Sequence, residues 1–329
     1  MMPATSAPRY REGVGVALHA WPRQEFTRAQ MYSDFGRGTI MVDGCCPEGP
    51  FIDPEHARAS LDHHRGVIRG ITQATCCQAY FGLPGGLFDA FRTDGVLDLT
   101  LHVNDCDPDV YSTVYVFTRH PHIYNRHVAR LIHVTGEIDV CGGWHPSIPL
   151  DSKILRELAW ISQPYVAARL NGELARMDAA GMLRIIELCC NRIDENVAGR
   201  GREVPLNMGY DVLDIAKAGF YLVRETGFYA RMLMRARGIE HFVSVREGPN
   251  GTFLYSNGFL QLAPSRTTPS IERQLAALLS AERVAGGTGS WGGSDIISGG
   301  PRAGSVLTPA VVCEVIAEVY GEHRARIGA

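Results

Sequence analysis

Side chains that could bind a metal ion stand in four short segments of the first 150 residues. They are Asp43, the run Asp62, His63 and His64, the group His102, Asp105, Asp107 and Asp109, and finally Asp139. The three acids of the third segment alternate, so in an extended chain their carboxylates would face one side. Carboxylates packed that closely repel one another, and a divalent cation is the usual counter-charge.

Mixed carboxylate and imidazole ligands suit Mn²⁺, with Mg²⁺, Fe²⁺ or Co²⁺ as competitors. Two such ions about 4 Å apart activate a water molecule and neutralise charge on a phosphoryl oxygen. The alternative is that these acids cap helices and form turns, as Asp residues often do. The combination of the four segments favours a metal site.

The segments that carry these residues are patterned as an α/β domain. Short apolar runs predict strands at 38–44, 57–64, 96–105 and 129–139, each of which ends in polar residues. Helices are predicted at 71–81 and 110–120. Because the carboxyl ends of parallel strands meet at one edge of a sheet, the polar strand ends predict a single site there.

The rest of the chain predicts two further parts. Residues 151–237 have helical periodicity and are interpreted as a helical connector between a first domain, 1–150, and a smaller α+β C-terminal domain, 238–329. The C-terminal domain is expected to contain a β-hairpin turning at the Pro-Asn-Gly sequence from Pro249, a helix near 270–283, and a last helix starting near Thr308. A glycine-rich stretch, 285–305, lies between these helices.

Composition excludes several classes of protein. The 329 residues are 45% hydrophobic and 20% charged with a formal net charge of −3, so the chain lacks the basic excess typical of proteins that bind long nucleic acid. It has no long apolar segment and no signal-peptide pattern, which predicts a cytoplasmic protein without a membrane partner. The nine cysteines show no zinc spacing and are expected to be small buried hydrophobes.

Four sequence motifs resemble those of the DHH phosphoesterase superfamily, which includes manganese-dependent pyrophosphatases, RecJ-type exonucleases and oligoribonuclease-like phosphatases. They are IMVDG around Asp43, SLDHHRG around Asp62, LHVNDCDPDVYST around Asp107, and IHVTGEIDVCGGW around Asp139. The motif order is permuted, because the family places its D-x-D motif first and here it follows DHH. The resemblance implies a DHH-type domain with a mostly parallel sheet, and a dinuclear manganese site.

The resemblance also implies a role for each residue. Asp43 would bridge two ions; Asp107 and His102 would bind the first ion; Asp109, His63 and Asp139 would bind the second. His64 would contact the phosphate or protonate the leaving group, and Asp62 would orient a histidine. In this family a glycine-rich loop of the smaller C-terminal domain closes over the substrate, which implies substrate contacts from Gly292, Gly293, Ser294 and Arg302. Arg65, just past the DHH motif, is a further candidate for an anion contact.

The function expected from these features is hydrolysis of a small phosphorylated metabolite or nucleotide by a metal-dependent phosphoesterase. Two alternatives stay open. One is a related enzyme that performs another metal-assisted reaction in specialised metabolism, and the other is a non-catalytic module that binds a nucleotide or phosphate. A homodimer is also left open.

Overall fold

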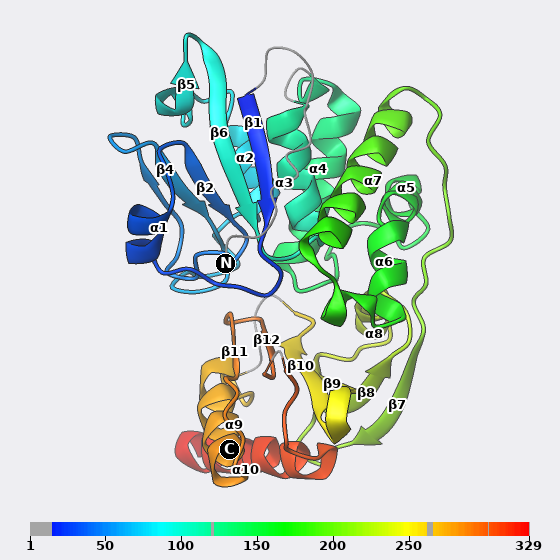
Figure 1. The fold of residues 1–329 in the computed structure, drawn as a ribbon. Coiled ribbons are helices and arrows are strands. Elements are labelled where there is room, and N and C mark those ends of the chain that lie inside the picture. The colour runs from blue at the N-terminus through cyan, green and yellow to red at the C-terminus, as the bar shows by residue number, and fades with distance from the viewer. Residues whose placement is uncertain (1–14, 120–121, 262–265, 302, 329) are drawn as a thin grey trace. The chain divides into compact units, whose positions relative to one another are not determined.

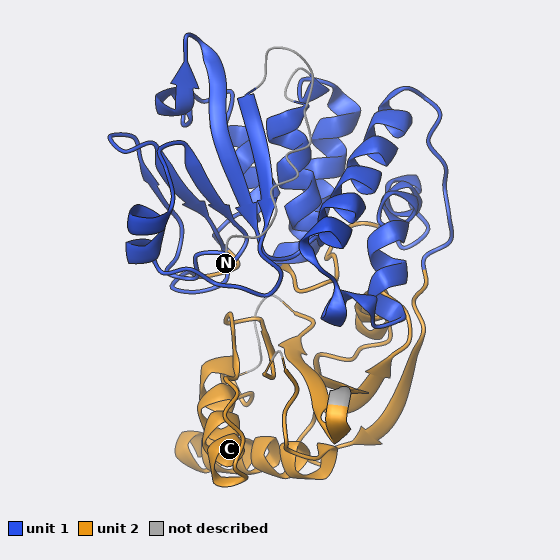
Figure 2. Cartoon of the chain, viewed as in Figure 1, with its two compact units in different colours: residues 1–67, 71–140, 149–206 blue, residues 68–70, 141–148, 207–329 orange. Residues whose placement is uncertain are grey.

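The computed structural model describes residues 15–119, 122–261, 266–301 and 303–328. The chain forms two compact units, shown in Figure 2. Unit 1 comprises residues 1–67, 71–140 and 149–206, and unit 2 comprises residues 68–70, 141–148 and 207–329. Each unit contains a mixed β-sheet with helices, so the predicted α/β class is confirmed.

The sheet of unit 1 supplies the edge that carries the candidate site. Its strands are β1 (Gly15–Ala20), β2 (Thr39–Val42), β3 (Phe51–Asp53), β4 (Arg58–Leu61), β5 (Arg92–Thr93) and β6 (Val96–Val103). They lie in the order β1-β6-β2-β4-β3, with β5 on β6. The first four in this order are parallel, whereas β3 and β5 are antiparallel to their neighbours. The strands predicted within 38–44, 57–64 and 96–105 are confirmed.

Helices of unit 1 are grouped along one side of this sheet, apart from α1 (Figure 1). Their bounds are α1 (Arg28–Asp34), α2 (Thr75–Gly82), α3 (Pro108–Thr118), α4 (Arg126–Val140), α5 (Lys153–Ile161), α6 (Gln163–Leu170) and α7 (Ala179–Val197), with the 3₁₀ turns η1 (Asp89–Phe91) and η3 (Glu173–Arg176). The helices predicted within 71–81 and 110–120 correspond to α2 and α3. Helix α3 begins after Asp107, whose side chain accepts the Val110 amide, and Pro108 follows it in the first turn.

The prediction of a strand at 129–139 is wrong, because this segment lies within helix α4. Its buried residues include Val128, Leu131, Ile132 and Thr135, a spacing of three and four that places them on one helix face. Gly136 allows the helix to approach α2, since a Cβ there would lie 2.5 Å from the Cys77 sulfur. Packing of this face outweighs the β propensity of the short Leu-Ile-His-Val run.

Unit 2 is built on a second six-stranded sheet in the order β11-β12-β10-β9-β8-β7. Its elements are β7 (Tyr210–Ile215), β8 (Tyr221–Glu225), α8 (Ala230–Ala236), β9 (His241–Glu247), η4 (Pro249–Gly251), β10 (Phe253–Phe259), α9 (Ile271–Val284), β11 (Gly292–Gly293), β12 (Ile297–Gly299) and α10 (Pro309–Ile327). The predicted hairpin is confirmed as β9 and β10, and its turn uses Asn250 and Gly251 at φ of 56° and 75°. The two predicted helices are confirmed as α9, capped by Ser270, and α10, capped by Thr308.

The expectation of a helical connector over 151–237 needs correction. Residues 151–206 contain α5, α6 and α7 and belong to unit 1, whereas the chain from Asn207 onward belongs to unit 2. Residues 210–225 form the strand pair β7 and β8 rather than a helix. Leu222 and Val223 are both buried, and because successive strand residues point to opposite faces of a sheet, both faces of β8 are covered at this point. Among the described residues, no helix combines the length and apolarity that crossing a membrane requires.

Candidate metal centre

The candidate site lies at the carboxyl edge of the unit 1 sheet. Asp43 directly follows β2, Asp62 directly follows β4, and the segment 104–109 follows β6. Because these strands lie side by side in the order β6-β2-β4, their carboxyl ends are neighbours. Asp139 comes from the last turn of helix α4, not from a strand.

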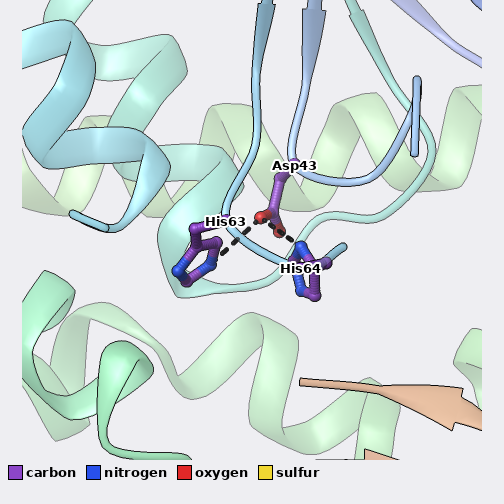
Figure 3. Close-up of side chains that lie close together, drawn as sticks. All are labelled: Asp43, His63 and His64. Atoms are coloured by element: carbon purple, nitrogen blue, oxygen red, sulfur yellow. Dashed lines mark ion pairs between the residues drawn. The ribbon is translucent and has the colours of Figure 1, made fainter. Parts of the chain in front are cut away.

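Asp43 stands between the two histidines of the DHH run (Figure 3). Its Oδ1 lies 3.5 Å from His63 Nε2 and 3.4 Å from His64 Nδ1. The side chain of His63 is fully buried and that of Asp43 is 5% exposed. These three residues offer ligand atoms within 4.8 Å of one another, close enough to hold one ion.

His63 also joins a second group of possible ligands. Its Nε2 lies 2.8 Å from Asp139 Oδ2 and 3.5 Å from Asp109 Oδ2. Oxygens from three carboxylates therefore surround one imidazole nitrogen. A single N–H at that nitrogen can donate to one of them at a time. A cation that binds several of these atoms at once satisfies this arrangement better than one proton does.

Helix α2 holds this cluster through its first turn. The Thr75 and Cys76 amides donate to the two oxygens of Asp109 at 2.8 and 2.7 Å, and the Thr75 hydroxyl donates to Asp43 Oδ1 at 3.2 Å. The sequence interpretation missed these residues. Their signal was the start of a predicted helix soon after the DHH motif, since the free amides at a helix start bind carboxylates.

Backbone turns set the direction in which the side chains at the strand ends point. Asp43 adopts φ of 52° and Gly44 of 76°, a left-handed pair that bends the chain immediately after β2. A non-glycine residue in this region is strained, and strain of this kind is often found at functional sites. Asp62 Oδ1 accepts the His63 amide, the His64 amide and His64 Nδ1–H at 2.8, 3.1 and 2.9 Å. The contact that an orienting role for Asp62 requires is thus present.

Burial and neighbouring charges shift the pKa values of the carboxyl groups in and beside this cluster. Burial, together with the charges of Asp43 and Asp139, raises the pKa of Asp109 to about 6. Burial also raises the pKa of Asp107 well above its usual value, with Asp43 as the first neighbouring charge that adds to it. For Asp43, burial acts in the same direction, but His64 and His63 outweigh it and its pKa is lowered. When all its carboxyls are ionised, the site therefore holds more negative charge than its two imidazoles can neutralise.

Two predicted ligands, Asp107 and His102, belong to neither group of ligand atoms found among the described residues, although Asp107 lies near enough to Asp43 for their charges to interact. Asp107 caps helix α3 by accepting the Val110 amide at 3.0 Å, which is the alternative role expected for an acid in this position. His102 is buried and accepts the indole N–H of Trp21 at its Nδ1, at 2.9 Å. Burial and the charge of His19 lower the pKa of His102 to about 3, so its ring is neutral.

The predicted substrate contacts have local structural roles. In unit 2, the Ser294 hydroxyl accepts the Ile296 and Ile297 amides and closes a turn. Gly292 and Gly293 form strand β11, and a Cβ on Gly293 would lie 2.4 Å from the Ile297 carbonyl oxygen. In unit 1, the half-exposed Arg65 lies 3.9 Å from Glu25. Arg302 lies outside the described residues.

The donor set fits a divalent cation. It combines carboxylate oxygens from Asp43, Asp109 and Asp139 with an imidazole nitrogen of His63, and the ring of His64 lies beside them. This mixture suits Mn²⁺ and similar first-row ions. Four of these five side chains are at least two-thirds buried, and excess negative charge in such a setting favours a bound cation.

Comparisons with known protein families, with curated proteins and with solved structures return no match for this chain.

Proposed function

We propose that this protein is a metal-dependent phosphoesterase that hydrolyses a small phosphorylated metabolite or nucleotide. The observation that carries the proposal is the convergence of three carboxylates on the buried His63, from the ends of β2 and α4 and the start of α3. The start of α2 accounts for the position of Asp109, but not for the approach of Asp43 and Asp139 to the same imidazole nitrogen. Their meeting on one imidazole favours a shared cation.

His63, Asp109 and Asp139 would hold one ion, and Asp43 would contribute a carboxylate to a second. When bound, divalent ions supply positive charge to phosphoryl oxygens and lower the pKa of water. The chain's own part is to hold these ligands in place. Thr75 and Cys76 do so for Asp109, because their amides fix both of its oxygens.

His64 is the group proposed to act on the substrate. Its side chain is 36% exposed, whereas that of His63 is fully buried. Its Nδ1–H donates to Asp62, which orients the ring, and the imidazole could then contact a phosphate or deliver a proton to the leaving oxygen.

The proposal is tested by measuring metal content and turnover together. We expect protein purified with Mn²⁺ to retain at least one equivalent of the metal and to release phosphate or alcohol from nucleotides or generic phosphodiesters. The substitutions Asp43→Asn and His63→Ala should abolish both properties, because each removes a ligand. Asp89→Asn is a matched control, since the Asp89 side chain is 69% exposed and forms an ion pair with Arg92 at 3.2 Å.

The outcomes separate the candidate functions. Metal content well below one equivalent under Mn²⁺ supplementation would refute the phosphoesterase. Stoichiometric metal without product would leave another metal-assisted reaction or a binding module. Tight nucleotide binding with no turnover would favour the binding module.

A further inference from the structure

A pocket in unit 1 lies beside the helix that holds the metal cluster. Its volume is about 500 Å³, within the range that accommodates a small ligand. Its wall residues include Ile52, Leu61, Phe81 and Leu87, with the amide side chains of Gln73 and Gln78 among them. The walls are therefore largely apolar, with polar groups at a few positions.

Helix α2 connects this pocket to the cluster. Residues three and four apart share a helix face, so Thr75, Gln78, Phe81 and Gly82 form one stripe along it. The stripe begins at Thr75, which donates to Asp43. Gln78, three residues and roughly 4.5 Å further along the axis, already lines the pocket.

Gln78 also ties the pocket wall to the DHH run. Its Nε2 donates to the Asp62 carbonyl oxygen at 2.9 Å. The neighbouring wall residue Leu61 is the last residue of β4, directly before Asp62. The pocket therefore starts about one helical turn from the carboxylate cluster and shares with it both α2 and the end of β4.

Two walls of the pocket leave apolar surface in contact with water. Phe81 is 47% exposed and Leu87 is 45% exposed. The Phe81 ring is held in place by Tyr80 and His133, whose ring centroids lie 5.4 and 5.2 Å away. A fixed aromatic wall with a free face is suited to stacking on an apolar ring. Inorganic phosphate or pyrophosphate would make no use of it.

We propose that this pocket binds an apolar ring of the substrate, so that the substrate is an organic phosphate ester with an aromatic or similarly apolar body. The inference rests on the proposed phosphoesterase function for the phosphate end only. Burial of the ring against Phe81 and Leu87 supplies affinity, and the cluster receives the phosphate.

The test uses the full-length, Mn²⁺-loaded protein and three probes. Titration calorimetry measures the affinity for 1-naphthylmethylphosphonate, a phosphate-ester analogue whose C–P bond is not hydrolysed, for 1-naphthol and for inorganic phosphate. The double substitution Phe81→Gln and Leu87→Gln removes the apolar walls. The control is Leu170→Gln, a change of the same kind at a residue that is 48% exposed, lies in α6 and is absent from the pocket lining.

The wild-type protein should bind 1-naphthylmethylphosphonate more tightly than inorganic phosphate. The double substitution should lower the affinity for both naphthyl probes about tenfold. This is the change expected when roughly 50 to 60 Å² of apolar contact is lost. Leu170→Gln should leave all three affinities as they are. Inorganic phosphate reports the metal cluster alone, and 1-naphthol reports the pocket alone.

These probes also separate failure of the pocket from failure of the function. Binding of inorganic phosphate without any binding of 1-naphthol, or equal naphthyl affinities in the wild type and the double variant, would overturn the pocket assignment and leave the phosphoesterase standing. Binding of 1-naphthol by a protein that takes up no Mn²⁺ would overturn the function and support the pocket as an apolar ligand site.

Discussion

Replacing Asp109 by Asn should stabilise the metal-free protein and, at the same time, remove its response to metal. Asp109 is fully buried, and its pKa of about 6 lies well above its ordinary value of 3.8. A raised pKa means that the folded protein holds the carboxylate charge at a cost. At pH 8 this cost is about 3 kcal/mol, from 1.36 kcal/mol per pH unit of difference.

The substitution removes this charge but weakens a contact. Asn retains one carbonyl oxygen for the amides of Thr75 and Cys76, and its NH₂ group would face the other amide, at a cost of about 1 to 2 kcal/mol. The net expectation in EDTA at pH 8 is a gain of about 1 to 2 kcal/mol in the free energy of unfolding.

The sign of the pH dependence follows from the raised pKa. Below its unfolded pKa of 3.8, Asp109 is neutral in both states and carries no penalty; the penalty grows as the pH rises toward the folded pKa of about 6 and is complete above it. The advantage of Asp109→Asn should therefore shrink by more than about 1 kcal/mol between pH 8 and pH 5.

Urea denaturation in EDTA and in Mn²⁺ measures both effects. The wild type should gain about 2.7 kcal/mol at a free Mn²⁺ concentration of 100 times the dissociation constant. Asp109→Asn should gain little, because it lacks a ligand. The exposed Asp89→Asn serves as control and should behave like the wild type. If the variant is destabilised in EDTA at pH 8, yet Mn²⁺ stabilises it as much as the wild type, then Asp109 neither holds an unfavourable charge nor binds the metal.

Two further predictions concern buried groups of unit 2. Burial lowers the pKa of His241 from its unfolded value of 6.5 to about 4. The folded protein therefore carries no penalty for this group above pH 6.5. It loses up to about 3 kcal/mol of unfolding free energy as the pH falls from 6.5 to 4. Urea unfolding at pH 7 and pH 4.5 should show this loss, and a His241→Asn variant with the same loss would contradict it. Glu282 is buried and accepts the Trp291 indole N–H and the Val306 amide, so Glu282→Gln should lose about 1 to 3 kcal/mol of unfolding free energy at pH 8, and an unchanged denaturation midpoint would argue against this.

Residues at strand ends could be predicted from the sequence because their position follows from local patterns. Short buried runs before Asp43 and Asp62 indicated β2 and β4, and parallel strands place such ends at one edge. Asp139 was placed among the ligands although its element was predicted wrongly as a strand. Its location depended on the spacing of the motif rather than on the local structure.

Contacts between distant segments could not be predicted in the same way. The hydrogen bond from Trp21 to His102 joins residues 81 positions apart, and the sequence around either residue does not indicate it. The same holds for the amides of α2 that hold Asp109, which come from 33 and 34 residues earlier in the chain. The strands β7 and β8 were missed because their short apolar runs also match a helical period, and only the sheet of unit 2 distinguishes the two.

The order of the acidic segments along the chain does not by itself prevent the acids from meeting. Strand β6 follows β2 and β4 in the chain but lies between β1 and β2 in the sheet, so the segment after it is delivered beside Asp43. In a parallel sheet every strand ends at the same edge, whatever its order in the chain. What the site requires is that the strands bearing Asp43 and the DHH run stay adjacent, and that α2 and α4 bring Thr75 and Asp139 to the same edge. Chain order sets only the length of the connections, and longer connections cost little additional entropy.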